Sequence, residues 1–419
     1  MSLPESYRYL PRLEKLNYIQ DQSVNAWIDN GYNGTIVLAT GIGKSIVALK
    51  AVYKALEHKK IKKKDTIFFL SETGERETTF RLQEFPFFKQ LTGNDITTDF
   101  DVQFYCYQNK RIPNTAKLAV YDEIQDALTD KYSYVFNLTF PYKLGLTATI
   151  PEHVSVFRNR IPAELVNKVK QSANTDLITD FINKGQLLEK QLPIVYEYDI
   201  HQAIDDGILS PYKTYIVNHA LDNKRLYLPL FKKTPKLSTE AQYYAVRQKM
   251  IMDRTKPKFL KGNMARSCVT LLYTLESKIE LVNKLVSQLE GKTLISGVHL
   301  EPLRKIKDIA VVEGDVTLKS IIRNNNQIIG TAKKLKQGAT IPGLQNLIMF
   351  SYTSSWKDFT QYVGRLTRYE EGKIGKVFII RTLNTYEMDW VDRIPAIYDK
   401  NLKRLPDLNM RLAEDIYGI

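Results

Sequence analysis

The sequence is poor in the residues that build metal centres and disulfide frameworks. Only 2 cysteines and 5 histidines occur among its 419 residues. Cys106 and Cys268 lie far apart between apolar and aromatic neighbours, which predicts neither a metal site nor a disulfide and favours a reducing compartment such as the cytoplasm. Residues 1–16 are polar and charged, without the apolar core of a secretory signal. No segment approaches the roughly 20 apolar residues of a membrane span, so no membrane partner is expected.

What is present is an ordinary globular composition with a strong positive charge. Hydrophobic residues make up 43% and charged residues 25% of the chain, and its length favours two domains. The formal net charge is +14, a balance that favours polyanionic partners. The simpler interpretation, a basic protein kept soluble by its charge, stays open at this point.

The positive charge is concentrated in residues 222–266, where twelve basic residues accompany three acidic ones. Several aromatic residues are interleaved with them, and phosphate pairing with base stacking is how single strands are bound without sequence preference. A surface helical insertion with solvated lysines explains the same pattern equally well. The candidate nucleic-acid contacts of this segment are Lys232, Lys233, Lys256 and Lys258.

Residues 37–45, V-L-A-T-G-I-G-K-S, read as a short strand, a glycine turn and the start of a helix. Backbone N–H groups of such a turn and the helix N-terminus together form a phosphate cradle. The pattern predicts ATP and Mg²⁺ as cofactors, with Lys44 on the β- and γ-phosphates and Ser45 on the metal. The cradle itself comprises Thr40, Gly41, Ile42 and Gly43. A purely structural turn is the alternative, because Ala39 stands where the usual pattern has its first glycine.

Two further apolar runs end in polar residues. Residues 117–121 predict a buried strand that ends in Asp122 and Glu123. Asp122 is placed to hold Mg²⁺ and Glu123 to deprotonate the attacking water. A solvated turn is the alternative for an isolated Asp-Glu pair. Residues 143–147 predict another strand, followed by Ala148 and Thr149.

Near the end of the chain, residues 361–368 read Q-Y-V-G-R-L-T-R. Arg365 and Arg368 are three residues apart, so on a helix they would share a face. Two guanidinium groups on one face suit a γ-phosphate approached from a second domain. A solvent-facing basic helix explains the same residues when they are considered alone.

The ordered set A-T-G-I-G-K-S, D-E-I-Q, T-A-T and Q-Y-V-G-R-L-T-R resembles motifs I, II, III and VI of the superfamily 2 helicases. Residues 195–212 are similar to the interdomain crossing of the restriction-type and phage UvsW-type members. The resemblance covers most of the chain, from about residue 18 to residue 381.

The resemblance also implies roles that the residues alone do not show. Gln20 would read adenine and Gln361 would bind the nucleotide. The residues that would couple ATP to the nucleic acid are Gln125, Thr147 and Thr149. The nucleic-acid contacts of motif Ia, of the following strand and of motif V would be Thr73, Gln108 and Thr331.

Two motifs depart from the family pattern. Motif II has Gln125 where His or Asp is usual, and motif V has Gln337 and Thr340 at positions that are usually acidic. The departures leave ATP binding expected but put the rate of hydrolysis in question. A nucleic-acid binding protein switched by ATP, with little turnover, is therefore an alternative function.

The predicted fold is α/β, with two RecA-like domains, each a mainly parallel sheet flanked by helices, and an ATP site in the cleft between them. We expect the ATP-binding domain at residues 1–210, the second domain at 211–383 with the basic insertion at 222–266, and a helical tail at 384–419. The strands are expected at 35–39, 66–70, 102–105, 118–121 and 143–147, and at 214–217, 293–296, 309–312, 327–330, 346–350 and 377–380. One helix is expected over 268–289.

The predicted function is that of an ATP-dependent helicase or translocase with DNA as its partner, in replication, recombination or repair. The restriction-like crossing favours DNA, and an RNA helicase is the other possibility. Usage rich in Lys, Asn, Ile and Tyr indicates an AT-rich genome and suggests a phage origin. The sequence gives no prediction for protein partners, polarity or oligomeric state.

Overall fold

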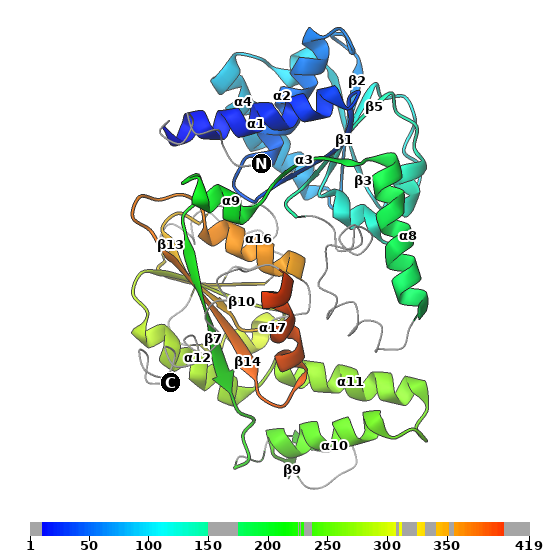
Figure 1. The fold of residues 1–419 in the computed structure, drawn as a ribbon. Coiled ribbons are helices and arrows are strands. Elements are labelled where there is room, and N and C mark those ends of the chain that lie inside the picture. Colours follow the sequence, from blue (N-terminus) through cyan, green and yellow to red (C-terminus); the bar gives the residue numbers. More distant parts are fainter. Residues whose placement is uncertain are drawn as a thin grey trace. The chain divides into compact units, whose positions relative to one another are not determined.

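The chain forms two compact units in the computed structural model, Met1–Ser210 and Pro211–Ile419 (Figure 1). The structure describes residues 11–149, 175–224, 226, 228–229, 237–306, 310–311, 325–331, 341–351 and 356–397. None of the helices in this described part has the length and apolarity of a membrane span.

A six-stranded sheet forms the centre of the first unit, in the order β3-β2-β4-β5-β1-β6. Every neighbouring pair in it is parallel. The strands are β1 (Asn33–Leu38), β2 (Thr66–Ser71), β3 (Asp101–Cys106), β4 (Leu118–Asp122), β5 (Tyr142–Thr147) and β6 (Ile194–Tyr198). Because all strands point the same way, the loops that follow them meet at one edge of the sheet.

The strands of this unit are short apolar runs because both faces of the sheet are covered. In β2, Phe69 faces a core built with α1 (Arg12–Asp29) and α2 (Lys44–Glu57). Its neighbours Phe68 and Leu70 face the opposite core, to which Leu188 of α8 (Thr175–Gln191) contributes. The alternation of side chains along a strand thus supplies both layers.

An aromatic cluster fixes the segment that follows β2. This segment runs through α3 (Glu75–Thr79), the π-helical η2 (Phe80–Glu84) and α4 (Phe85–Thr92). The ring of Phe80 lies 4.9 Å from that of Phe69 and 5.9 Å from that of Phe104 on β3. The remaining elements of the unit are α5 (Ile96–Asp99), η3 (Ile124–Leu128), η4 (Ser133–Asn137) and α9 (Ile200–Asp205).

The second unit contains a second six-stranded parallel sheet, in the order β11-β12-β10-β13-β14-β7. The strands are β7 (Tyr212–His219), β10 (Lys292–Gly297), β11 (Ala310–Val311), β12 (Gln327–Thr331), β13 (Leu344–Met349) and β14 (Gly375–Thr382). The apolar side of α12 (Glu276–Gln288) packs on this sheet through Ile279, Val282 and Leu285. The other helices in contact with it are α13 (Leu300–Leu303), α16 (Trp356–Leu366) and α17 (Tyr386–Ile397).

A helical hairpin, α10 (Glu240–Met252) and α11 (Lys258–Leu272), follows β7 and a short antiparallel pair, β8 (Leu228–Pro229) and β9 (Leu237–Ser238). The first helix begins with a capping box, since Thr239 and Gln242 satisfy one another's backbone N–H groups. Most of the hairpin lies within residues 222–266, the segment that the sequence marks as strongly basic.

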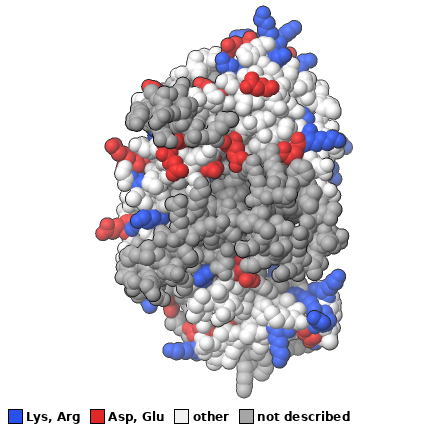
Figure 2. Space-filling view, viewed as in Figure 1, with Lys and Arg blue, Asp and Glu red and all other residues white. Residues whose placement is uncertain are grey.

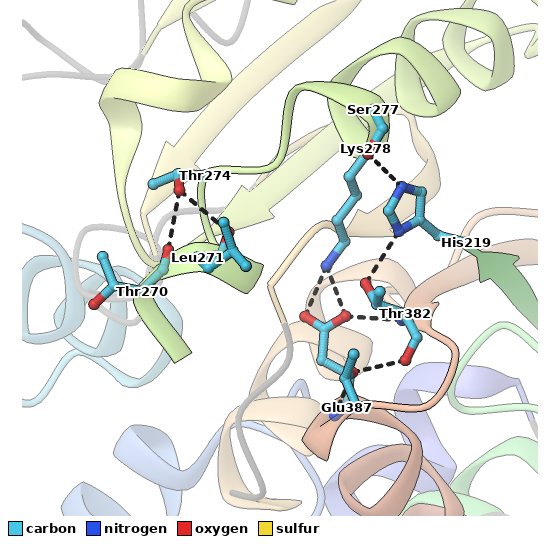
Figure 3. A network of polar contacts seen from close by, with 9 residues as sticks. His219, Thr270, Leu271, Thr274, Ser277, Lys278, Thr382 and Glu387 are labelled. Atoms are coloured by element: carbon cyan, nitrogen blue, oxygen red, sulfur yellow. Dashed lines mark hydrogen bonds and ion pairs between the residues drawn. The ribbon is translucent and has the colours of Figure 1, made fainter. Parts of the chain in front are cut away.

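Buried polar contacts join the base of the hairpin to the sheet of the second unit (Figure 3). The Lys278 ammonium lies 2.7 Å and 2.9 Å from the two carboxylate oxygens of Glu387, and both side chains are 0% exposed. Nearby, His219 at the end of β7 contacts the hydroxyls of Thr382 and Ser277. Ser277 in turn donates to Glu240, the first residue of α10, so the hairpin is tied to the sheet by hydrogen bonds.

The predicted fold class is confirmed, since both sheets are parallel and flanked by helices. The expected strands occur within two residues of their predicted bounds, whereas β6 was not predicted as a strand of the first sheet. The prediction of a single helix over 268–289 is wrong, because the helical structure is interrupted between α11 and α12. There the Thr274 hydroxyl donates back to the carbonyls of Thr270 and Leu271 (Figure 3), and Leu275 has an extended backbone with ψ of 123° before α12 begins.

Candidate nucleotide-binding site

The loop after β1 has the backbone form of a phosphate cradle. Gly41 and Gly43 adopt φ values of +99° and +88°, which other residues rarely adopt. A Cβ at Gly43 would also lie 2.9 Å from the Gln20 amide nitrogen, so a side chain there would displace Gln20. Lys44 is the first residue of α2 and Ser45 the second, which places both at the positive end of that helix.

Gln20 supports this loop from α1. Its amide nitrogen donates to the carbonyl oxygen of Ile42 at 2.8 Å, and the residue is 4% exposed. The role expected for Gln20, recognition of adenine, remains a prediction. The structure adds a role in shaping the cradle that the sequence did not suggest.

The two carboxylates of motif II lie at the end of β4. Asp122 is the last residue of the strand, and Glu123 follows with φ of +53°, an uncommon conformation for a residue with a side chain. Glu123 Oε1 lies 3.5 Å from Lys44 Nζ, and Glu123 Oε2 accepts a hydrogen bond of 2.7 Å from Gln125. Lys44 and Glu123, which are 79 positions apart in the sequence, are thereby brought together. An unusual backbone conformation such as that of Glu123 is found more often at functional sites.

Arg76 is a member of this site that sequence reasoning missed. Its Nε donates to Asp122 Oδ2 at 2.6 Å, and its guanidinium lies 4.9 Å from the ring centre of Phe80. Burial acts to lower the pKa of Arg76, but the carboxylates of Asp122 and Glu123 outweigh it and raise that pKa. Nothing in the polar sequence around Arg76 distinguishes it from a surface arginine.

Thr147 and Thr149 bond to each other at the end of β5. The Thr147 hydroxyl donates to the Thr149 carbonyl at 2.8 Å and accepts from the Thr149 N–H at 3.2 Å. Gln125, the third residue assigned to coupling, bonds to Glu123. All three lie at the strand ends that carry the loop and the carboxylates, and their coupling role remains a prediction.

The donor set fits a nucleotide with its metal. Thr40 Oγ1 is buried beside the loop and has no hydrogen-bond partner among the described residues, which leaves it available to a phosphate oxygen. Within the same residues, no group of three or more His, Cys, Asp or Glu side chains is arranged to hold a metal. Mg²⁺ bound mainly through phosphates and water needs only one or two protein ligands, and Ser45 and Asp122 are of the right type.

Arg365 is buried in the last turn of α16, and Arg368 is half-buried just beyond that helix. Arg365 is 5% exposed, whereas Arg368 lies two residues beyond the helix, and their shared role at a γ-phosphate remains a prediction. Burial and the neighbouring Arg368 lower the pKa of Arg365 to about 10. Gln361 Oε1 is buried without a hydrogen-bond partner in the described part of the chain.

The expected nucleic-acid contacts separate into three groups. Thr73 and Gln108 follow β2 and β3, which are adjacent in the first sheet with Ser71 opposite Cys106, so both lie at the same edge. Thr331 ends β12 in the second unit. Lys232 and Lys233 lie outside the described residues, and the other two lysines, Lys256 and Lys258, belong to the α10–α11 hairpin.

The tip of that hairpin combines positive charge with exposed apolar side chains. Figure 2 shows lysine and arginine side chains gathered over the end of α10 and α11, at the lower right. Asp253 is the single acidic residue of segment 241–275. Met252 and Phe259 are 76% and 73% exposed on either side of the turn. The cations are Lys249, Arg254, Lys256, Lys258, Lys261 and Arg266.

Comparison with known families bears on the first unit. Residues 13–152, about a third of the chain, match the family described as "Type III restriction enzyme, res subunit". This region contains the loop, Asp122 and Glu123. The match supports the resemblance of this part of the chain to the superfamily 2 helicases. Comparison with curated proteins finds no significant match.

Solved helicase and restriction-enzyme structures share the fold of this chain. Dbp5 of S. cerevisiae, bound to RNA and ADP BeF3, has a TM-score of 0.50 and 12% identity over 93% of this chain and 92% of its own. A putative HsdR subunit of a type I restriction enzyme from Vibrio vulnificus YJ016 has a TM-score of 0.50 and 18% identity over 91% and 67%. The Type ISP restriction-modification enzyme LlaBIII, bound to DNA, has a TM-score of 0.51 and 16% identity over 92% of this chain but 29% of its own. At these identities the likeness shows the fold alone.

Proposed function

We propose that the chain is an ATP-dependent nucleic-acid helicase or translocase that acts on DNA. The observation that carries this proposal is the convergence of Lys44, Asp122 and Glu123 at one edge of a parallel sheet, beside a loop with two left-handed glycines. A structural turn would need no carboxylate opposite its lysine. An ATP-hydrolysing site needs all of these parts.

In the proposed reaction, the loop N–H groups and Lys44 hold the triphosphate, and Gln20 maintains the loop through Ile42. Mg²⁺, when bound, neutralises charge on the phosphate oxygens, and Ser45 and Asp122 are its protein ligands, directly or through water. Glu123 orients the attacking water and takes its proton. The short bond from Gln125 fixes the carboxylate of Glu123 in place for this step.

The second unit is proposed to supply the remaining cations. Arg365 and Arg368 would stabilise charge on the transferring phosphoryl group, and Gln361 would contact the nucleotide. Arginines in this role contribute about 10³ to 10⁵ in rate in related phosphoryl-transfer systems. The lowered pKa of Arg365, caused by burial and by Arg368, supports the idea that these cations are arranged for an anion.

The α10–α11 hairpin and the edge formed by Thr73 and Gln108 are the proposed nucleic-acid contacts. Six cations with a single acidic residue near them favour a phosphate backbone, and an exposed phenylalanine can stack on a base. The match to a restriction-enzyme subunit family and the bound DNA of LlaBIII favour DNA as the substrate. An RNA substrate is the second candidate, because Dbp5, which was solved with RNA, shares the fold.

A switch with little turnover is a further candidate, favoured by Gln337 and Thr340 in motif V. Both residues lie outside the described part of the chain, so this alternative rests on the sequence.

The test is ATP hydrolysis by the purified chain with no nucleic acid, single-stranded DNA, forked duplex DNA or RNA. The proposal predicts strong stimulation by DNA that Lys44→Ala abolishes. Stimulation by RNA alone would move the substrate to RNA. Near-zero turnover on every substrate, with ATP-dependent DNA binding retained, would establish the switch and refute the motor.

A further inference from the structure

Arg76 lies between two features that the proposed function uses separately. Its side chain reaches Asp122, the proposed metal ligand, and its backbone belongs to α3, which begins two residues after Thr73. Thr73 lies only three residues before Arg76 in the sequence, whereas Asp122 lies 46 residues after it. Arg76 thus connects the predicted nucleic-acid contact Thr73, through the backbone, with the proposed metal ligand Asp122, through an ion pair.

The contact with Asp122 engages one carboxylate oxygen and leaves the other available. Arg76 Nε donates to Oδ2, and Oδ1 accepts no hydrogen bond from any described residue. The backbone of Asp122 is held separately, because the buried Tyr107 hydroxyl donates to its carbonyl at 2.8 Å. With the backbone and Oδ2 both fixed, the direction of Oδ1 is determined by where Arg76 lies.

Arg76 itself is held in place by an aromatic surface. Its guanidinium lies over the ring of Phe80, which is 1% exposed and packs against Phe69 and Phe104 of the sheet. A guanidinium stacked on a buried ring loses little further freedom when it bonds to a carboxylate. The Arg76 side chain is therefore held in one position, unlike a flexible surface arginine.

The backbone of Arg76 is joined to a compact turn around Thr73. The Thr73 carbonyl accepts from the Ser71 hydroxyl at 2.9 Å and from the Arg76 N–H at 3.4 Å. A displacement of Thr73 by a bound strand must move the first turn of α3, and with it Arg76. Gln108 lies at the same edge, so a phosphate backbone bound there would act on this turn.

We propose that Arg76 is a positioning residue through which nucleic acid bound at Thr73 and Gln108 aligns Asp122 for Mg²⁺. The proposal rests on the proposed function and assigns the contact that makes nucleotide binding at the first unit respond to nucleic acid. Because the coupling is between two binding events, it is reciprocal: the strand raises the affinity for Mg²⁺–ATP, and Mg²⁺–ATP raises the affinity for the strand.

The chain offers a closely matched control in Arg81. Its Nε also donates to a carboxylate, Glu77 at 2.7 Å, and its guanidinium also lies over a phenylalanine ring, Phe104 at 5.0 Å. It lies on the same helical segment, yet it does not contact Asp122. Arg81→Met and Arg76→Met therefore remove the same kind of contact, and only the second touches the metal ligand.

The experiment measures binding of a fluorescent ATP analogue by the full chain as Mg²⁺ is titrated, with and without a 20-nucleotide oligothymidine. For the unaltered chain and Arg81→Met, the oligonucleotide lowers the Mg²⁺ midpoint. For Arg76→Met the midpoint rises at least about tenfold, equivalent to about 1.4 kcal/mol, and no longer responds to the oligonucleotide. Arg76→Lys keeps the charge without the Nε geometry and gives an intermediate midpoint.

Each outcome decides between coupling and a purely structural role. A midpoint that still responds to the oligonucleotide in Arg76→Met, to the same extent as in Arg81→Met, overturns the proposal. Equal loss of binding in both variants at every Mg²⁺ concentration also overturns it, since that pattern reports damage to α3. If the unaltered chain binds no ATP analogue, the nucleotide site itself is refuted, and the proposal is refuted with it. Binding without any oligonucleotide effect refutes the coupling alone.

Discussion

The buried ion pair of the second unit gives a sharp prediction about stability. Lys278 and Glu387 are both 0% exposed, and the Glu387 carboxylate also accepts the Thr382 N–H at 2.9 Å. Burial lowers the pKa of Lys278, and the carboxylate of Glu387 offsets part of that effect. The pair lies where α12 and α17 meet the end of β14, so its loss should lower the stability of the whole sheet of the second unit.

Replacement of Lys278 by methionine keeps the apolar stem and removes the charge. The Glu387 carboxylate would then be buried with one backbone N–H as its remaining partner in Figure 3. Removal of one partner of a buried pair costs about 3 to 5 kcal/mol. The double variant Lys278→Met with Glu387→Gln leaves no buried charge and keeps an acceptor for Thr382, so we expect it to lose less than about 2 kcal/mol.

Hydrogen exchange in increasing urea, followed by mass spectrometry, reads the two units separately. Peptides from β14 and α12 should show the loss in Lys278→Met and its partial recovery in the double variant. Peptides from β4 in the first unit are the internal control and should not change. A single variant within about 1 kcal/mol of the unaltered chain, or a double variant no better than the single, would refute the reasoning.

Three other predictions concern separate parts of the molecule. Burial, and then Lys278, lower the pKa of His219 to about 3. The neutral imidazole therefore contributes its full stability above about pH 6.5, and this contribution is lost as the pH falls toward 3, with about 2 kcal/mol lost by pH 5. His219→Gln should flatten the acid side of the curve of stability against pH measured for β7 peptides. Gln20→Ala removes the bond to Ile42 and should weaken ATP binding about two- to tenfold by equilibrium titration, whereas Gln22→Ala on the same helix should not. Replacement of Lys249, Lys258 and Lys261 by glutamine should reduce the slope of log affinity for single-stranded DNA against log salt by about 2, and an unchanged slope would exclude the hairpin as a phosphate contact.

The sequence predicted most of what is local. The loop at 40–43 and the strand that ends at Asp122 depend on adjacent residues, and parallel strands bring their carboxyl ends together wherever they pair. The proximity of Lys44 and Glu123 therefore followed from motif order and fold class, and the structure confirms that they meet at 3.5 Å.

What the sequence could not predict depends on contacts between distant residues. Arg76 meets Asp122 across 46 positions, and Lys278 meets Glu387 across 109. Neither has a local pattern that distinguishes it from a solvated charge. The break after α11 was missed because apolar spacing continues through it, whereas the backbone is extended at Leu275. The strand β6 was read as a crossing segment because pairing with β1 is decided by the assembled sheet.

The central claim is that the first unit hydrolyses ATP with Glu123 as its base. The most direct test compares steady-state phosphate release by the unaltered chain and Glu123→Gln at saturating single-stranded DNA, with ATP affinity measured in parallel. We expect a loss in kcat of at least about 10²-fold with ATP affinity nearly unchanged. Turnover by Glu123→Gln at the rate of the unaltered chain would contradict it.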